Sequence, residues 1–152
     1  MPTLLRRGRG ERGAALLEVA LTLPLLMFVC VGILEFGRAY QTWQVLTNAA
    51  REGARVAVLP GMDDAAVTSR VRQYMAAGAL LKANDNTVTI GINRNQTVSI
   101  GGANTASASQ VTVNYPFDFM VLDPIARLAT RQSNNFGATL NMVASATMRN
   151  ES

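Results

Sequence analysis

Residues 14–34 read AALLEVALTLPLLMFVCVGIL and carry one charged side chain, Glu18. As a helix rising about 1.5 Å per residue, this stretch is about 31 Å long, which matches the roughly 30 Å hydrocarbon core of a bilayer. Residues 19–34 have no charge at all and span about 24 Å. The sequence therefore predicts a membrane-spanning helix over residues 14–34, with Glu18 close to one interface.

The residues before this segment are strongly basic. Four arginines, Arg6, Arg7, Arg9 and Arg12, stand against one acid, Glu11, and the rest of the chain has ten basic and nine acidic residues. Because positive flanks stay in the cytoplasm, we expect a cytoplasmic N-terminus and all residues after 34 on the far side. The clustering favours a topogenic signal over a basic patch, so no nucleic-acid partner is expected.

The composition excludes several classes of protein. The 152 residues suffice for one domain with an appendage, and the 49% apolar and 16% charged residues are typical of a chain that meets lipid. There is no His and one Cys, which excludes His-ligated metals, Ser-His-Asp and Cys-His catalysis and an intramolecular disulfide. The acidic groupings, such as Asp63-Asp64, are explained by caps and turns. We predict no enzymatic activity, no cofactor and no metal site.

The apolar segment is open to three interpretations. A cleaved secretory signal needs small residues after the apolar run, and residues 32–36 (GILEF) are a poor match. An uncleaved single-pass anchor that displays a periplasmic binding domain remains an alternative. In the third interpretation, Gly13 ends a basic leader and Glu18 is the fifth residue of the apolar helix that starts at Ala14. This arrangement resembles the processing site of type IV pilins and pseudopilins.

That resemblance implies cleavage by a prepilin peptidase between Gly13 and Ala14, with residues 1–13 as the leader. It also implies that Glu18 pairs with the new amino terminus of a neighbouring subunit. A carboxylate in lipid costs about 2.5–3.5 kcal/mol at mid-bilayer and less near an interface, so a positive partner would offset the cost. From the residues alone, Glu18 could equally reach the headgroups or cap the helix start.

Two longer stretches narrow the resemblance. Residues 12–40 (RGAALLEVALTLPLLMFVCVGILEFGRAY) and 48–58 (NAAREGARVAV) resemble the TadE-like minor pilins of tight-adherence (Flp) systems, and residues 146–151 (ATMRNE) extend the likeness weakly. Val19 stands where the small major Flp subunit has an aromatic residue. The resemblance implies a structural subunit for assembly or initiation of an adhesive pilus. Its implied partners are the bacterial inner membrane, the peptidase, other pilins or pseudopilins and the assembly platform, and after assembly it would lie in an extracellular pilus.

Two further features of the helix are candidate functional residues. Pro24 removes a backbone donor and is expected to kink or loosen the helix near Ala20, which would help it bend during extraction. At the membrane exit stand Glu35, Phe36, Gly37 and Arg38. Glu35 and Arg38 are three apart, so they form a surface pair, set the helix depth or contact an assembly partner.

Residues 35–152 are expected to form a pilin-like extracytoplasmic α+β domain. The long helix should continue to about residue 59 and end at Pro60-Gly61, with Glu52 and Arg55 on a solvated face. Apolar residues at spacings of three or four predict its buried stripe: Phe36, Tyr40, Trp43, Leu46, Ala50, Ala54 and Ala57.

The remaining elements are predicted from changes of period. A second helix is expected over residues 63–81, with Val67, Val71, Tyr74 and Gly78 on its stripe and Arg70 and Arg72 solvated. Alternation over residues 87–100 predicts a hairpin turning at 93–96, and residues 101–110 are expected to form a flexible loop. Further strands are expected at 111–115 and 140–148, with a helical turn from Asp123-Pro124 that carries Ile125 and Leu128. Phe117, Phe119 and Met120 are assigned to the core.

Overall fold

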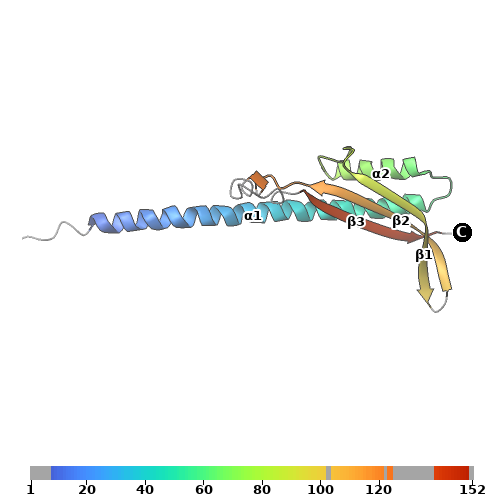
Figure 1. Ribbon diagram of the computed structural model, residues 1–152, viewed down its shortest axis with the longest axis horizontal. Coiled ribbons are helices and arrows are strands. Elements are labelled where there is room, and N and C mark those ends of the chain that lie inside the picture. Colours follow the sequence, from blue (N-terminus) through green and yellow to red (C-terminus); the bar gives the residue numbers. More distant parts are fainter. Residues whose placement is uncertain (1–7, 102–103, 122, 125–138, 151–152) are drawn as a thin grey trace, which may run out of the picture.

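A computed structural model of the chain describes residues 8–101, 104–121, 123–124 and 139–150. Figure 1 shows a long helix whose N-terminal part projects from a head made of the other elements. The described strands form one antiparallel sheet in the order β1-β2-β3. This confirms the predicted α+β class, with a long N-terminal helix, a second helix and a small antiparallel sheet. The elements are α1 (Gly8–Ala57), α2 (Asp64–Ala77), β1 (Thr89–Gly101), β2 (Asn104–Phe117) and β3 (Leu140–Arg149).

Helix α1 has a bare half and a covered half. Every residue from Gly13 to Cys30 is exposed, whereas the face that begins at Leu46 is fully buried under the head. The helix ends at Ala57, two residues before the predicted end, and Pro60 and Gly61 follow. The residues of the buried face recur every three or four positions. Most of them are alanine, and these small side chains let the sheet and α2 approach the helix closely. The buried face consists of Leu46, Ala49, Ala50, Ala54 and Ala57.

The predicted stripe is wrong for its first three members. Phe36, Tyr40 and Trp43 remain 66%, 65% and 45% exposed. Their periodicity matches the buried stripe, but they lie closer to the apolar end, where the described parts of the head leave this face of α1 largely uncovered.

Helix α2 is shorter than predicted and uses a different stripe. Asp63 caps its first turn, because the Asp63 carboxylate accepts a hydrogen bond of 2.8 Å from the Ala66 amide. The helix ends at Ala77 instead of residue 81. Its buried residues are Val67, Val71 and Met75, whereas Tyr74, predicted to be buried, is 37% exposed. Steps of four residues keep the actual stripe on the side that faces α1.

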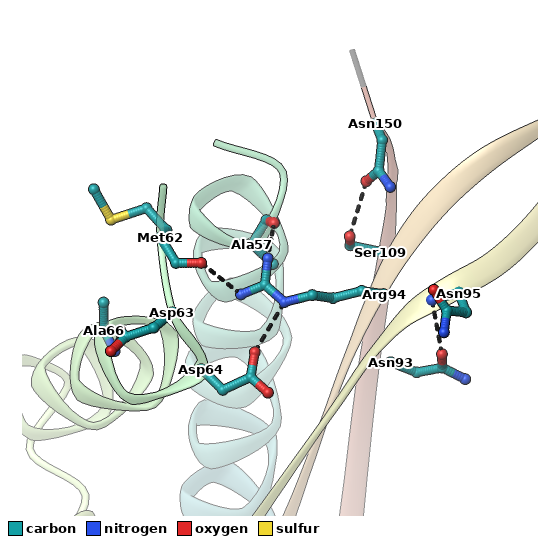
Figure 2. Close-up of polar contacts among 10 residues, drawn as sticks. All are labelled: Ala57, Met62, Asp63, Asp64, Ala66, Asn93, Arg94, Asn95, Ser109 and Asn150. Atoms are coloured by element: carbon teal, nitrogen blue, oxygen red, sulfur yellow. Dashed lines mark hydrogen bonds and ion pairs between the residues drawn. The ribbon is translucent and has the colours of Figure 1, made fainter. Parts of the chain in front are cut away.

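Strand β1 corrects the predicted hairpin. Residues 93–96 are not a turn but a bulge within β1, where the pairing with β2 shifts between Asn93 and Gln96. The bulge delivers Arg94 to the ends of two helices: Arg94 donates to the Ala57 carbonyl at 2.7 Å, to the Met62 carbonyl at 2.9 Å and to Asp64 at 2.9 Å. Figure 2 shows these three contacts converging on the guanidinium. A bulge re-aims a side chain in this way without ending the strand.

Residues 101–110 are also corrected, since most of them belong to β2. Small polar residues suggested a loop, but Ala108 and Ser109 are buried in the middle of the sheet. Ser109 donates to the Asn150 side chain at 2.8 Å, a contact drawn in Figure 2. The true connection follows Gly101, whose φ of +114° suits glycine.

The sheet packs its larger side chains onto α1. Val111, Val113, Tyr115 and Phe117 alternate along the buried face of β2. Pro116 is tolerated because it lies beyond Asn114, the last residue of β2 that pairs with β1. The remaining predicted strand is β3, in which Met142 and Ala144 are buried. Of the predicted turn at Asp123-Pro124, residues 125 and 128 lie outside the described part of the chain.

Candidate functional site

The predicted cleavage site and Glu18 lie on the bare half of α1. Gly13, Ala14 and Glu18 are exposed, and a Cβ atom at Gly13 would meet nothing within 4 Å. Because α1 begins at Gly8, the Gly13–Ala14 bond lies inside the helix. In the described part of the chain the Glu18 carboxylate has no ion pair, and the Glu18 carbonyl accepts a 2.8 Å hydrogen bond from the Thr22 hydroxyl.

Pro24 lies within α1, and the helix continues through it without interruption. Its neighbours from residue 14 to residue 30 are all exposed, so no described part of the head supports the helix at this point. The missing amide leaves the Ala20 carbonyl without its usual helical donor. Easier bending at Pro24 therefore stays a prediction.

Two of the four predicted membrane-exit residues, Glu35 and Arg38, form a clamp between α1 and the segment that follows β2, whereas Phe36 and Gly37 are exposed. The Glu35 side chain is 4% exposed and accepts a 2.9 Å bond from Arg38 and a 2.7 Å bond from the Val121 amide. Arg38 also donates to the Asp118 carbonyl at 2.5 Å, and its guanidinium lies 4.6 Å from the centre of the Phe117 ring. Glu35 and Arg38 are thus not a simple surface pair, because each also binds a backbone group at least 80 positions away in the sequence.

The electrostatics of Glu35 agree with this geometry. Burial by itself would raise the pKa of the Glu35 carboxyl, but the hydrogen bonds from Arg38 and from the Val121 amide outweigh it and lower the pKa. Glu35 is therefore held as a charged acceptor. An ionised carboxylate with two donors is the arrangement that a buried acid needs.

A second set of contacts holds the same segment from the α2 side. Lys82 forms an ion pair with Asp118 and donates to the Pro116 carbonyl at 3.3 Å. Phe119 packs edge-on against Phe117, with ring centres 5.2 Å apart, and against Phe36 at 6.5 Å. Phe117 is buried as predicted and Phe119 is half-buried, whereas Met120, also assigned to the core, is 64% exposed.

Glu52 and Arg55, which were expected on a solvated face of α1, form an ion pair of 2.8 Å, and a third residue joins them. Arg70 of α2 contacts the same Glu52 oxygen at 3.0 Å, so the predicted solvated face is a bridge between the two helices. The hydrogen bond from Arg55 is the largest cause of a lowered Glu52 pKa, and the hydrogen bond from Arg70 acts in the same direction. Together they bring the pKa of Glu52 to about 2, although burial acts in the opposite direction. The prediction that Arg72 is solvated is wrong as well, since it donates to the Ala83 carbonyl at 2.9 Å.

Several of these contacts have no signal in the sequence. The partners of Glu35 and Arg38 include the Val121 amide and the Asp118 carbonyl, which are backbone groups present at nearly every residue. Their spacing of three could reveal the pair but not its partners. Among the described residues there is no group of three or more His, Cys, Asp or Glu side chains that could hold a metal ion.

Comparison with known proteins bears on α1. No curated protein and no solved structure matches the chain. The family model described as TadE-like protein matches residues 13–55, which begin at Gly13 and end two residues before the end of α1. The same helix is long and apolar enough to cross a membrane. Residues 13–55 are therefore similar to TadE-like proteins, and this similarity suggests a protein associated with Tad pili.

Proposed function

We propose that this chain is a minor pilin-like structural subunit used in the assembly or initiation of a Tad/Flp-type adhesive pilus. A prepilin peptidase cuts it between Gly13 and Ala14, and the mature helix starts in the inner membrane with the head in the periplasm. The family match over residues 13–55 and the leader ending in Gly13 support this proposal. The partners are the peptidase, other pilins or pseudopilins and the assembly platform.

The bare half of α1 is the observation that carries the proposal. Its large apolar side chains are uncovered, with Leu16 at 71%, Leu21 at 69% and Ile33 at 67% exposed. Leaving a side chain of this size in water costs about 1.5–3 kcal/mol, so the segment needs an apolar environment. Lipid supplies it before assembly, and helices of other subunits supply it in a filament. A head-to-tail contact of this kind extends without closing.

Glu18 provides the specificity of that contact. It lies about 6 Å along the axis from Ala14, so a subunit offset by about one helical turn brings its new amine close to this carboxylate. The carboxylate has no ion-pair partner within the described chain, which leaves it available to another subunit. In an apolar surrounding an unpaired carboxylate is costly, so the pairing selects one helix offset over others.

The alternative is an uncleaved single-pass anchor that displays a periplasmic binding domain. One observation favours it: the Gly13–Ala14 bond lies inside the helix that begins at Gly8, so a peptidase must first unwind the start of α1. Gly13 weakens the helix at this point, because glycine costs about 1 kcal/mol relative to alanine in a helix interior.

Mass spectrometry of the mature N-terminus separates the two functions. The full chain is expressed with and without a prepilin peptidase and isolated from membranes. We expect a chain that begins at Ala14 only when the peptidase is present. A chain that begins at Met1 under both conditions would establish the anchor instead.

A matched pair of variants tests the site itself. Gly13→Leu is expected to block processing, whereas Gly10→Leu, a change of the same kind within the leader, should leave it intact. Equal processing of both variants would contradict cleavage after Gly13.

A further inference from the structure

An exposed apolar surface surrounds the point where α1 leaves its bare half. We call it the basal surface, and it draws on three separate parts of the chain: α1, the segment after β2 and the start of β3. All of its side chains are more than 40% exposed although they are large and apolar. Its members are Phe36, Tyr40, Trp43, Met120, Val121 and Leu140.

The three parts are held at the same level by contacts already described. The Val121 amide binds Glu35, which is the residue directly after Leu34. Leu140 is paired with Phe117, the last residue of β2, beside the Arg38 clamp. Residues far apart in sequence therefore bring their apolar side chains to the end of the apolar segment. A groove between α1 and β3, lined by Phe36, Trp43 and the first residues of β3, belongs to this surface.

The α1 part of the basal surface continues the lipid-facing stripe. At about 100° per residue, Phe36, Tyr40 and Trp43 fall within an arc of about 60° on the helix. Val29 and Ile33, which are 50% and 67% exposed, lie in nearly the same arc. The apolar stripe therefore runs without a break from the apolar segment to Trp43.

Height above the membrane decides whether this stripe can reach lipid. Trp43 lies nine residues beyond Leu34, or about 14 Å along the axis. The headgroup layer on each side is only about 5–7 Å thick, so an upright helix would hold Trp43 above it. With a tilt of about 30–40°, within the range of membrane helices, side chains on the lower face descend into that layer.

We propose that the basal surface lies on the outer headgroup layer of the membrane, with α1 tilted and the α1–β3 side of the head facing lipid. Tyr and Trp side chains concentrate at this depth because one end of each ring is apolar and the other polar. A second copy would cover one side of α1, whereas the basal surface includes side chains from three elements around the exit. The inference rests on membrane insertion, which is part of the proposed function, and not on cleavage or assembly.

Trp43 makes the inference testable, because it is the only Trp of the chain. The full chain is reconstituted at low protein density in phosphatidylcholine–phosphatidylglycerol vesicles. Some vesicles contain lipids brominated near the glycerol end of the acyl chain, and others contain lipids brominated near the methyl end. We expect Trp43 emission at shorter wavelength than for a water-exposed Trp, and a larger loss of intensity with bromine near the glycerol end.

Two variants serve as controls. Trp43→Phe combined with Ser69→Trp moves the reporter to an exposed position on α2, where emission should stay at long wavelength and bromine should have little effect. Tyr40→Asp combined with Leu140→Asp places two charges on the basal surface and should abolish the quenching of Trp43. Both replaced side chains are exposed, at 65% and 45%, so the core is left intact.

The outcomes separate this inference from the proposed function. If alkaline carbonate extracts the chain from the vesicles, the chain is not inserted, and both this inference and the proposed function are overturned. If the chain resists extraction but bromine near the glycerol end does not quench Trp43, the basal surface does not meet lipid and only this inference is overturned. It is overturned equally if the emission shift appears only at high protein density and without quenching, since a second copy then covers the surface.

Discussion

Gly53 and Gly37 both lie inside α1, but their surroundings are opposite. A Cβ atom at Gly53 would come within 2.5 Å of a Val71 methyl carbon and 3.1 Å of a Val111 methyl carbon, whereas one at Gly37 would meet nothing within 4 Å. Gly53 therefore allows α1, α2 and β2 to meet at one point. Gly78 has the same role beside Val45, again at 2.5 Å.

We expect Gly53→Ala to destabilise the head by about 1–3 kcal/mol, because the added methyl group overpacks the junction of α1 and α2. Gly37→Ala is the matched control and should be neutral or stabilising by up to about 1 kcal/mol, since alanine is the better helix former. Thermal unfolding of both variants measures the difference. A Gly53→Ala protein as stable as the parent would show that α2 can shift without cost.

Glu18 is the residue at which the proposed assembly can be tested most directly. Glu18→Leu should leave membrane insertion intact, because it removes a charge from an apolar helix, and should impair pilus formation. Glu18→Asp, which keeps the charge on a shorter side chain, should retain part of the assembly. Membrane fractionation and pilus yield are the two measurements, and an unchanged yield for Glu18→Leu would refute the pairing role.

At the scale of elements, α1 and α2 are joined by charges as well as by apolar packing. Glu52 accepts from Arg55 on its own helix and from Arg70 on α2, and its pKa falls to about 2 from the ordinary value of 4.5. A lowered pKa in the folded state means that the stabilisation is complete above pH 4.5 and is lost as the pH falls toward 2.

The pH dependence of unfolding tests this bridge. We expect the difference in Tm between the parent protein and Glu52→Gln to be largest above pH 4.5 and to shrink as the pH is lowered toward 2. Glu52→Gln keeps the size of the side chain, so it isolates the charge. A difference in Tm that stays constant over this pH range would mean that the bridge contributes through packing alone.

Arg94 ties a third element to the same pair of helices. Its guanidinium satisfies the Ala57 carbonyl at the end of α1, the Met62 carbonyl and Asp64 in the first turn of α2. Arg94→Lys keeps the charge but cannot present the planar set of donors. We expect it to lower stability by about 1–3 kcal/mol, measured by denaturant unfolding, whereas Arg51→Lys on the exposed face of α1 should change little.

The helices were more predictable than the sheet for physical reasons. A helix of 50 residues repeats its pattern many times, so α1 and its end at Ala57 could be predicted within two residues. Strand β1 contains a bulge that could not be predicted from residues 87–100, because its role is to bring Arg94 into contact with the helix ends. The first half of β2 consists of small polar residues whose burial depends on strands on both sides, a tertiary effect that local sequence does not contain.

The candidate site was also predictable only in part. Glu18, Glu35 and Arg38 could be singled out because charges are rare in and beside an apolar segment. The clamp could not be foreseen, since Glu35 and Arg38 bind backbone groups of residues 118 and 121. The exposure of Phe36, Tyr40 and Trp43 is not predictable from periodicity, which identifies a face but not whether another element covers it.

At the scale of the whole molecule, the head has its own core. All buried apolar residues of α1 lie between Leu46 and Ala57, and the rest come from α2, the sheet and the residues between them. The apolar segment contributes nothing to this core in the described chain. The proposed division at residue 34 stays a prediction that the next experiment addresses.

A chain without residues 1–34 should fold and remain soluble without detergent, because it keeps the complete core and loses the exposed apolar rod. Its cooperative thermal unfolding, followed by circular dichroism, is the measurement. Leu46→Ala in the same shortened chain should cost about 2–5 kcal/mol, since Leu46 is fully buried. A shortened chain that aggregates or unfolds without cooperativity would show that the head depends on the membrane segment.

Because one uninterrupted helix joins the two halves, the rotational orientation of the head about the helix axis is fixed relative to the apolar half. Inserting a single residue between Leu34 and Glu35 would rotate the head by about 100° about the helix axis. Inserting seven residues would bring it nearly back to its original orientation. In a stack of such subunits, the heads would then share one repeating azimuth dictated by the packing of the rods.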